Sequence, residues 1–191
     1  MSFLIACDGS SLRSLNGEVG KGPIGWAWAR EDGHWYANGH YVGTNQRAEL
    51  LGLLTVLLMH PKDDIVVQLD SKYALNTVES WMWGWAKKGW TKSDGNEVIN
   101  LDIIKTIYDV YPTRSGKLDL EWVKGHDKNN SNPLNTQADL LANSTSNRVK
   151  DALKNGDLTS TFYSDSKQRE HNPVEFKHVS NLLPSFDQSM L

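Results

Sequence analysis

Four carboxylates occupy places in this 191-residue chain where they could share one chemical task. Asp8 follows the apolar run 3–7, Asp70 follows a second apolar run, and Glu49 and Asp139 each precede a leucine-containing stretch. Burying an unpaired carboxylate costs several kcal/mol unless it takes up a proton, so four acids in one place would repel one another unless cations held them. Oxygen donors of this kind suit Mg²⁺ or Mn²⁺ rather than zinc, and the single cysteine of the chain provides no thiolate pair.

Each of these acids also has an ordinary local explanation. Asp8 could be a turn residue before a glycine, Asp70 could cap the helix that follows it, and Glu49 would favour a helix dipole. Thr136 and Asp139 fit the pattern of a capping box. Each explanation is sufficient for one acid alone. Together the four acids indicate two divalent ions about 3.5–4 Å apart, an arrangement that serves phosphoryl displacement.

The elements that would position these acids follow from the hydrophobic pattern. Apolar runs predict strands, the Asp32–Gly33 pair predicts a hairpin, and leucines at helical spacing predict a long helix with one apolar face. We predict strands at 2–8, 22–31, 34–43, 64–70 and 117–125, helices at 45–60, 71–89, 96–111 and 136–147, and no regular structure at 11–22. This order predicts an α/β fold, a five-stranded mixed sheet flanked by helices.

In that layout the acids share one edge of the sheet. Asp8 and Asp70 would end the first and fourth strands, while Glu49 and Asp139 would lie in the first turns of two helices. Ligands of such sheets gather beyond the carboxyl ends of the strands, where helix N-termini also point. We therefore expect the four acids to meet there.

The composition bounds the class of protein. A net charge of −3 excludes a wholly basic coat for nucleic acid and leaves room for a local basic patch. One cysteine, Cys7, excludes an internal disulfide and indicates a reducing compartment. The chain shows no charged-then-apolar leader and no apolar run near the roughly 18 residues of a membrane span, so we predict a cytoplasmic protein without membrane contact.

A change in composition divides the chain. The eight tryptophans all lie at or before Trp122, and the chain from Arg148 onward is rich in Ser, Asn and Asp with balanced charge. We predict a folded domain at 1–147 and a partly helical or weakly structured extension at 148–191. Two interpretations of the extension stay open: an arm that lies on the domain or on a neighbouring copy, and a short end that binds a protein partner weakly.

Six motifs in order resemble the type 1 ribonuclease H family, the bacterial-type ribonuclease HI. They are "CDGS" (7–10), "TNQRAEL" (44–50), "LDSKYAL" (69–75), "WGWAKKGW" (83–90), "EWVKGH" (121–126) and "NTQADLLA" (135–142). The resemblance covers residues 1 to about 147 and implies a ribonuclease H-like fold. It also implies an endonuclease that cuts the RNA strand of RNA–DNA hybrids and leaves 5′-phosphate and 3′-hydroxyl ends.

The resemblance assigns roles to the acids. Asp8, Glu49, Asp70 and Asp139 would bind two Mg²⁺ ions, for which Mn²⁺ would substitute, with Asp8 bridging the pair. Asp139 would help hold the ion that activates water, while Glu49 and Asp70 would hold the ion near the leaving oxygen. His126 matches a histidine that aids proton transfer or product release, a role that suits an imidazole titrating near neutral pH.

The resemblance also implies surfaces that bind the hybrid. Asn45 and Gln46 would read sugar and base edges in the minor groove, and Thr44 and Asn100 would line a pocket for a DNA phosphate. A basic protrusion would grip the DNA strand through lysines and aromatic faces. Its residues are Trp81, Trp85, Trp90, Lys87, Lys88 and Lys92. The alternative role of these tryptophans is to pack the helix pair, which we expect of at least one.

Three departures from the family pattern stand out. The loop after Asp8 is long, Val42 or Gly43 replaces a basic residue before Thr44, and the segment after His126 is extended. None touches the four acids. Two other classes remain as alternatives: a non-catalytic nucleic-acid-binding module on the same fold, and a nuclease that acts on DNA, such as a junction resolvase. We expect a monomer.

Overall fold

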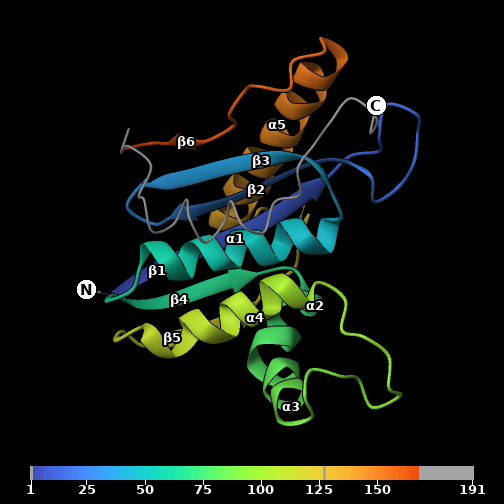
Figure 1. Cartoon of the computed structure of the whole chain (residues 1–191). Coiled ribbons are helices and arrows are strands. Elements are labelled where there is room, and N and C mark those ends of the chain that lie inside the picture. The colour runs from blue at the N-terminus through green and yellow to red at the C-terminus, as the bar shows by residue number, and fades with distance from the viewer. Residues whose placement is uncertain (1, 127, 168–191) are drawn as a thin grey trace.

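A mixed sheet forms the centre of the computed structural model, which describes residues 2–126 and 128–167 (Figure 1). Its strands run in the order β5-β4-β1-β2-β3-β6. Strands β1, β2, β3 and β6 pair antiparallel, whereas β1, β4 and β5 pair parallel. The strands are β1 (Ser2–Ser11), β2 (Gly22–Arg30), β3 (Trp35–Gly43), β4 (Asp64–Leu69), β5 (Leu118–Trp122) and β6 (Ser164–Asp165). The predicted fold class is confirmed.

Helices cover both faces of the sheet. The helix α1 (Asn45–Met59) packs on β1 and β2, and α5 (Pro133–Lys154) packs on β1, β2 and β3 from the opposite face (Figure 1). Helix α4 (Leu101–Val110) lies against α1, and α2 (Lys72–Asn76) and α3 (Met82–Lys87) continue from β4. Among the described residues, no helix is both long and apolar enough to cross a membrane.

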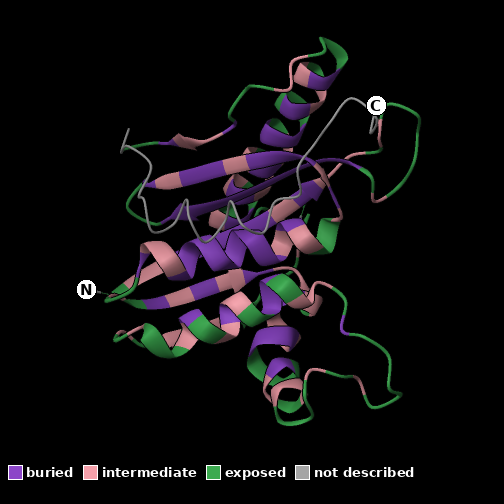
Figure 2. Ribbon diagram, viewed as in Figure 1, coloured by how far each residue is buried: buried purple, intermediate pink, exposed green. Residues whose placement is uncertain are grey.

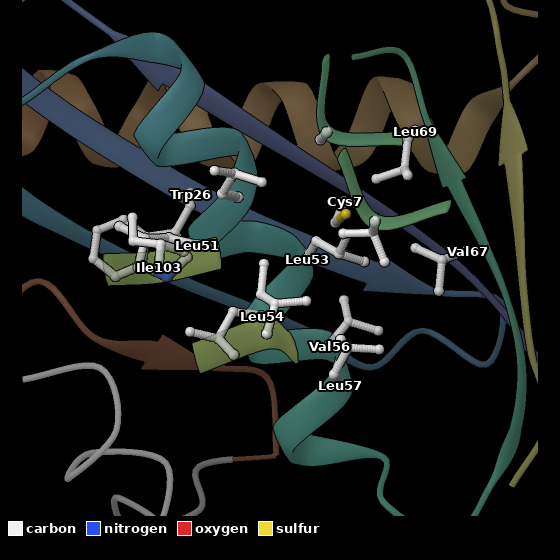
Figure 3. Close-up of a cluster of buried hydrophobic side chains, with 14 of the residues drawn as sticks. Cys7, Trp26, Leu51, Leu53, Leu54, Val56, Leu57, Val67, Leu69 and Ile103 are labelled. Carbon is white, nitrogen blue, oxygen red and sulfur yellow. The ribbon is translucent and has the colours of Figure 1, made fainter. Parts of the chain in front are cut away.

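The core lies between the sheet and α1. Leu50, Leu53, Leu54, Leu57 and Leu58 form the predicted apolar face. The first four are fully buried against the sheet and Leu58 is half-buried (Figure 3). Leu51 lies off that face and is fully buried too, because α4 packs against α1 and brings Ile103 beside it (Figure 3). Val56, also off that face, is fully buried as well. The middle of helix α1, residues 50–57, is therefore buried on all sides, and Figure 2 shows it as a buried stretch between partly exposed ends.

Two strands differ from the prediction. Strand β1 continues three residues past its expected end, because antiparallel pairing with β2 goes on to the Ser11↔Ile24 pair. Asp8 therefore lies inside β1 and not at its end. The sheet also has six strands instead of five in the described part of the chain, since Ser164 and Asp165 pair with Ala37 and Tyr36 at the edge of β3.

The helices differ at their ends. Helix α4 begins at Leu101 instead of residue 96, and α5 begins at Pro133 and continues to Lys154. Asp139 consequently lies past the first turn in which we expected it. Helix α1 begins at Asn45 as predicted, but Glu49 is its fifth residue and also lies past the first turn. The capping-box interpretation is wrong, because Asn132 precedes α5 and the Thr136 hydroxyl donates to Asn130 Oδ1 at 2.8 Å.

The predicted helix 71–89 is interrupted. A π-helical turn (Thr77–Trp81) separates α2 from α3, and the backbone N–H of Met82 donates to the Thr77 carbonyl. The indole of Trp83 donates to the Val78 carbonyl at 2.9 Å. Ser71, and not Asp70, caps α2, since its hydroxyl accepts from the Ala74 N–H at 3.1 Å.

The described part of the C-terminal extension packs on the domain. Phe162 is buried against Tyr41, with Val149 and Leu153 of α5 in the same cluster. Asp165 Oδ1 lies 2.9 Å from His34 Nε2, and both side chains are fully buried. The predicted division at 147 falls within α5 and stays a prediction, and the part of the extension at 168–191 lies outside the described residues.

Candidate active site

The predicted acids meet in one cleft. Parallel pairing of β1 with β4 ends at Ala6↔Gln68, so Asp8 and Asp70 come just beyond the last paired residues of neighbouring strands. Helix α1 supplies Glu49 from one side and α5 supplies Asp139 from the other. The cleft has a volume of about 270 Å³ and is lined by Asp8, Gly9, Ser10, Ser11, Asn45, Glu49, Asp70, His126, Asp139 and Asn143. The structure thus brings together all five residues predicted for catalysis.

Asp8 is the most buried of the four acids, with 7% of its surface exposed. Burial raises the pKa of its carboxyl group to about 8, and the charges of Asp70 and Asp139 and a hydrogen bond shared with Asp139 act in the same direction. The backbone N–H of Gly9, which donates to Asp8 Oδ1 at 2.7 Å, opposes this rise. A side chain at Gly9 would overlap the backbone of α1 at Glu49, so this glycine permits the approach that brings the two acids together.

Glu49 is held at both of its carboxylate oxygens. Asn45 Nδ2 donates to Oε1 at 2.6 Å, and the Ser71 hydroxyl donates to Oε2. Burial raises the pKa of Glu49, the hydrogen bond from Ser71 lowers it, and the charge of Asp70 raises it. Asn45, predicted to contact substrate, therefore also orients an acid of the cleft.

Asp70 contacts the chain on two sides. The indole of Trp122 donates to its backbone carbonyl at 3.1 Å, and Asn135 Nδ2 donates to its carboxylate at 3.3 Å. Asn135 is 3% exposed, and its Oδ1 has no hydrogen-bond partner among the described residues. Sequence reasoning missed Asn135, although it opens the motif that contains Asp139.

Asp139 faces His126 across the mouth of the cleft. Its Oδ2 lies 3.8 Å from His126 Nδ1, and the His126 side chain is 81% exposed. His126 has a φ of +48°, a left-handed conformation that places the ring at a turn of the β5–α5 loop. The imidazole therefore stands between the solvent and a half-buried carboxylate.

The donor set of the cleft suits hard divalent cations. Four carboxylates converge there, and in residues 2–126 and 128–167 we find no ion pair between any of them and a lysine or arginine. In the described chain no three His, Cys, Asp or Glu side chains are arranged to hold an ion as they stand. Binding would therefore require the carboxylates to turn toward a common point. Burial raises the pKa of Asp8, and repulsion from Asp70 and Asp139 raises it further; a bound cation would relieve this repulsion.

The predicted phosphate-pocket residues are joined by an arginine that sequence reasoning missed. The Thr44 hydroxyl caps α1 by accepting from the Arg47 N–H at 3.2 Å. Asn100 Oδ1 accepts from Arg47 Nη1 at 3.4 Å, and Asn100 Nδ2 donates to the Tyr73 hydroxyl at 3.1 Å. Arg47 also pairs with Asp102 at 2.8 Å. Gln46 is exposed at the start of α1.

The predicted protrusion divides into an outer and an inner part. Trp81 is 41% exposed and lies 5.9 Å from Trp85, while Lys87 and Lys88 are exposed. Trp90 instead packs edge-on against Tyr108 of α4 at 5.2 Å. The expectation that at least one tryptophan packs the helix pair is confirmed for Trp90. Lys92 is half-buried.

The sheet order and the acidic cleft define a ribonuclease H-like α/β protein. The RNase H family model matches residues 1–147, and the chain belongs to the ribonuclease H family of enzymes. It is 34% identical over 147 residues to the ribonuclease H of Tropheryma whipplei (strain Twist), which covers 76% of this chain and 84% of that protein. It is 33% identical over 159 residues to the ribonuclease H of Xanthomonas euvesicatoria pv. vesicatoria (strain 85-10), which covers 80% of this chain and 98% of that protein.

Solved structures share the fold. LC9-RNase H1, a type 1 RNase H with the type 2 active-site motif, is similar with a TM-score of 0.65 and 19% identity, covering 100% of this chain and 90% of that chain. The foamy viral protease-reverse transcriptase in complex with an RNA/DNA hybrid is similar with a TM-score of 0.62 and 17% identity, covering 75% of this chain and 20% of that chain.

Proposed function

We propose that this protein hydrolyses the RNA strand of RNA–DNA hybrids with two divalent ions held in the acidic cleft, and that it leaves 5′-phosphate and 3′-hydroxyl ends. The observation that carries the proposal is the convergence of Asp8, Glu49, Asp70 and Asp139 on one cleft. Family membership supports it, because the matched residues 1–147 contain all four acids.

The side chains of the cleft have distinct tasks in this proposal. Asp8, the most buried acid, would bridge the two ions; Glu49 and Asp70 would hold one and Asp139 the other. Two Mg²⁺ ions, or Mn²⁺ in their place, would supply an activated water and stabilise the leaving oxygen. Asn45 and Ser71 keep Glu49 turned in one direction, and the exposed ring of His126 holds or releases a proton beside Asp139.

An RNA–DNA hybrid is the substrate that the surroundings of the cleft support best. Gln46 and Asn45 are exposed at the start of α1, and Asn45 lines the cleft, so a bound hybrid could present sugar and base edges to them. The outer part of the protrusion offers Trp81, Lys87 and Lys88 to a phosphate backbone at a distance from the cleft. A structure of similar fold contains an RNA/DNA hybrid.

The test is a cleavage assay with three matched substrates. Labelled RNA–DNA hybrid, RNA duplex and DNA duplex of one sequence are incubated with the full chain and Mg²⁺, Mn²⁺ or EDTA. We expect cleavage of the RNA strand of the hybrid alone, with either metal and not with EDTA. Asp70→Asn keeps the shape of the side chain and serves as the inactive control. Cleavage of the DNA duplex would support the DNA nuclease instead, and binding without cleavage would support the non-catalytic module.

A further inference from the structure

A chain of hydrogen bonds leads from the interface between β1 and α5 to one acid of the cleft. The Ser146 hydroxyl lies 3.0 Å from the Ser10 hydroxyl, which donates to Asn143 Oδ1 at 2.7 Å. Asn143 Nδ2 in turn donates to Asp139 Oδ1 at 2.8 Å. Three side chains from two elements far apart in the sequence are therefore connected to a single carboxylate oxygen.

The direction of these bonds is determined at the Asp139 end. An ionised carboxylate only accepts, so the Asn143 amide must present its N–H groups to Asp139 and its oxygen to Ser10. The Ser10 hydroxyl then satisfies this amide oxygen. Ser10 is 7% exposed and Ser146 is fully buried, so water does not readily replace either partner.

The geometry separates the two oxygens of Asp139. Oδ1 is occupied by Asn143, which lies one helical turn further along α5, whereas Oδ2 faces the His126 ring at 3.8 Å. The carboxylate also shares a hydrogen bond with Asp8. A carboxylate anchored through one oxygen cannot rotate freely to avoid the other acids of the cleft. Asn143 thus limits the orientation of Asp139 without adding charge to a site that already contains four acids.

We propose that Asn143 is a positioning residue for the metal-binding carboxylate of Asp139, and that Ser10 maintains Asn143 in the orientation that does this. The inference rests on the proposed function, because it assigns Asp139 to a divalent ion. Partners in the outer shell of a metal site typically change metal affinity or activity by about 10–100-fold when they are removed.

The experiment compares Asn143→Ala, Ser10→Ala and the double variant with the wild-type full chain. Mn²⁺ affinity is measured by calorimetry without nucleic acid, and the Mg²⁺ concentration for half-maximal hybrid cleavage is measured separately. Asn147→Ala is the matched control, because Asn147 lies one turn further along α5. Within the described part of the chain its amide donates to the Asn143 backbone carbonyl alone, at 2.8 Å. Melting temperatures without metal report any loss of folding.

We expect Asn143→Ala to weaken Mn²⁺ binding and raise the Mg²⁺ requirement by about tenfold, at the lower end of the outer-shell range. KM for the hybrid at saturating Mg²⁺ should not change. Ser10→Ala should change the same quantities less, and the double variant should equal Asn143→Ala, because Ser10 acts through Asn143.

Three results would overturn the proposal. The first is wild-type Mn²⁺ affinity in Asn143→Ala, and the second is an equal loss of Mn²⁺ affinity in Asn147→Ala. The third is a double variant whose loss of Mn²⁺ affinity is the product of the losses in Ser10→Ala and Asn143→Ala. If the wild-type chain binds Mn²⁺ but cuts no hybrid, the proposed function fails, while the calorimetric comparison still decides the role of Asn143.

Discussion

Replacing Asp8 by Asn should stabilise the metal-free protein while it abolishes hybrid cleavage. Asp8 is buried, and Asp70 and Asp139 are its charged neighbours. Asparagine has nearly the same shape, keeps an oxygen that can accept the 2.7 Å hydrogen bond from the Gly9 N–H, and has no charge to desolvate. The acid that the proposed reaction needs is thus the acid that folding disfavours when no metal is present.

The magnitude follows from the pKa of Asp8, which rises from its ordinary value of 3.8 to about 8. Between these values the native state binds the proton and the unfolded state does not, so stability falls as the pH rises through this window. Because pH 7 lies about 3.2 pH units above 3.8 and each unit corresponds to about 1.36 kcal/mol, this loss of stability at pH 7 has an upper limit of roughly 4 kcal/mol. Relaxation of the cleft reduces the loss of stability, so we expect Asp8→Asn to raise the free energy of unfolding by about 1–4 kcal/mol.

The assay is urea unfolding in EDTA, followed by tryptophan fluorescence, at pH 8, pH 7 and pH 4. Glu49 titrates in both proteins, so the difference in free energy of unfolding between variant and wild type isolates Asp8. The difference should be largest at pH 8 and smallest at pH 4, where Asp8 is protonated in the native state and about half protonated in the unfolded state. Added Mg²⁺ should stabilise the wild type more than the variant.

Asp32→Asn serves as a control that should change the free energy of unfolding in the opposite direction. Arg30 donates two hydrogen bonds to the Asp32 carboxylate at 2.8 Å and lowers its pKa, so Asp32→Asn should destabilise the protein at neutral pH. The reasoning is refuted if Asp8→Asn is no more stable than the wild type at pH 8, or if its gain is as large at pH 4.

The remaining predictions concern the histidine, the protrusion and the extension. His126→Ala should slow hybrid turnover without abolishing it, because the ions supply most of the transition-state stabilisation; complete loss in a single-turnover assay would assign the ring a larger role. Changing Lys87, Lys88 and Lys92 together to Ala should weaken hybrid binding and flatten its logarithmic salt dependence by up to about three units, and an unchanged slope would contradict an electrostatic grip. A chain ending at Asn147 should still fold and cut hybrid, but with a lower melting temperature than a chain ending at residue 167, because it lacks the buried Val149 and Leu153 and strand β6. Equal melting temperatures would show that the extension adds no stability.

The sequence predicts the elements whose signals are local. The Asp32–Gly33 pair marks the hairpin because its glycine takes the φ of +86° that the turn requires. Leucine spacing identifies α1, and the placement of Asp70 after a strand follows from a short apolar run. The resemblance in six motifs brings the four acids to one site before any contact is known.

Features that depend on distant contacts could not be predicted. Strand β6 is only two residues long and forms because β3 offers an unpaired edge. The burial of Leu51 depends on α4 packing behind α1, which no periodicity within α1 reveals. The hydrogen bond from Ser10 to Asn143 joins residues 133 positions apart, and an asparagine on a polar helix gives no sign of it.

The π-helical turn at Thr77–Trp81 sets the direction in which the protrusion faces. Successive residues of an α-helix are about 100° apart around its axis and about 1.5 Å apart along it. Deleting one residue from this turn would restore regular α-helix and leave the protrusion facing nearly the same way, because a π-helical turn holds about one residue more than an α-helical turn. Deleting Gly84 from α3 would instead rotate everything beyond it by about 100° relative to the sheet. Trp85, Lys87 and Lys88 would then remain in the sequence and yet face elsewhere. A substrate that spans the cleft and the protrusion should therefore tolerate a one-residue deletion in the π-helical turn better than one in α3.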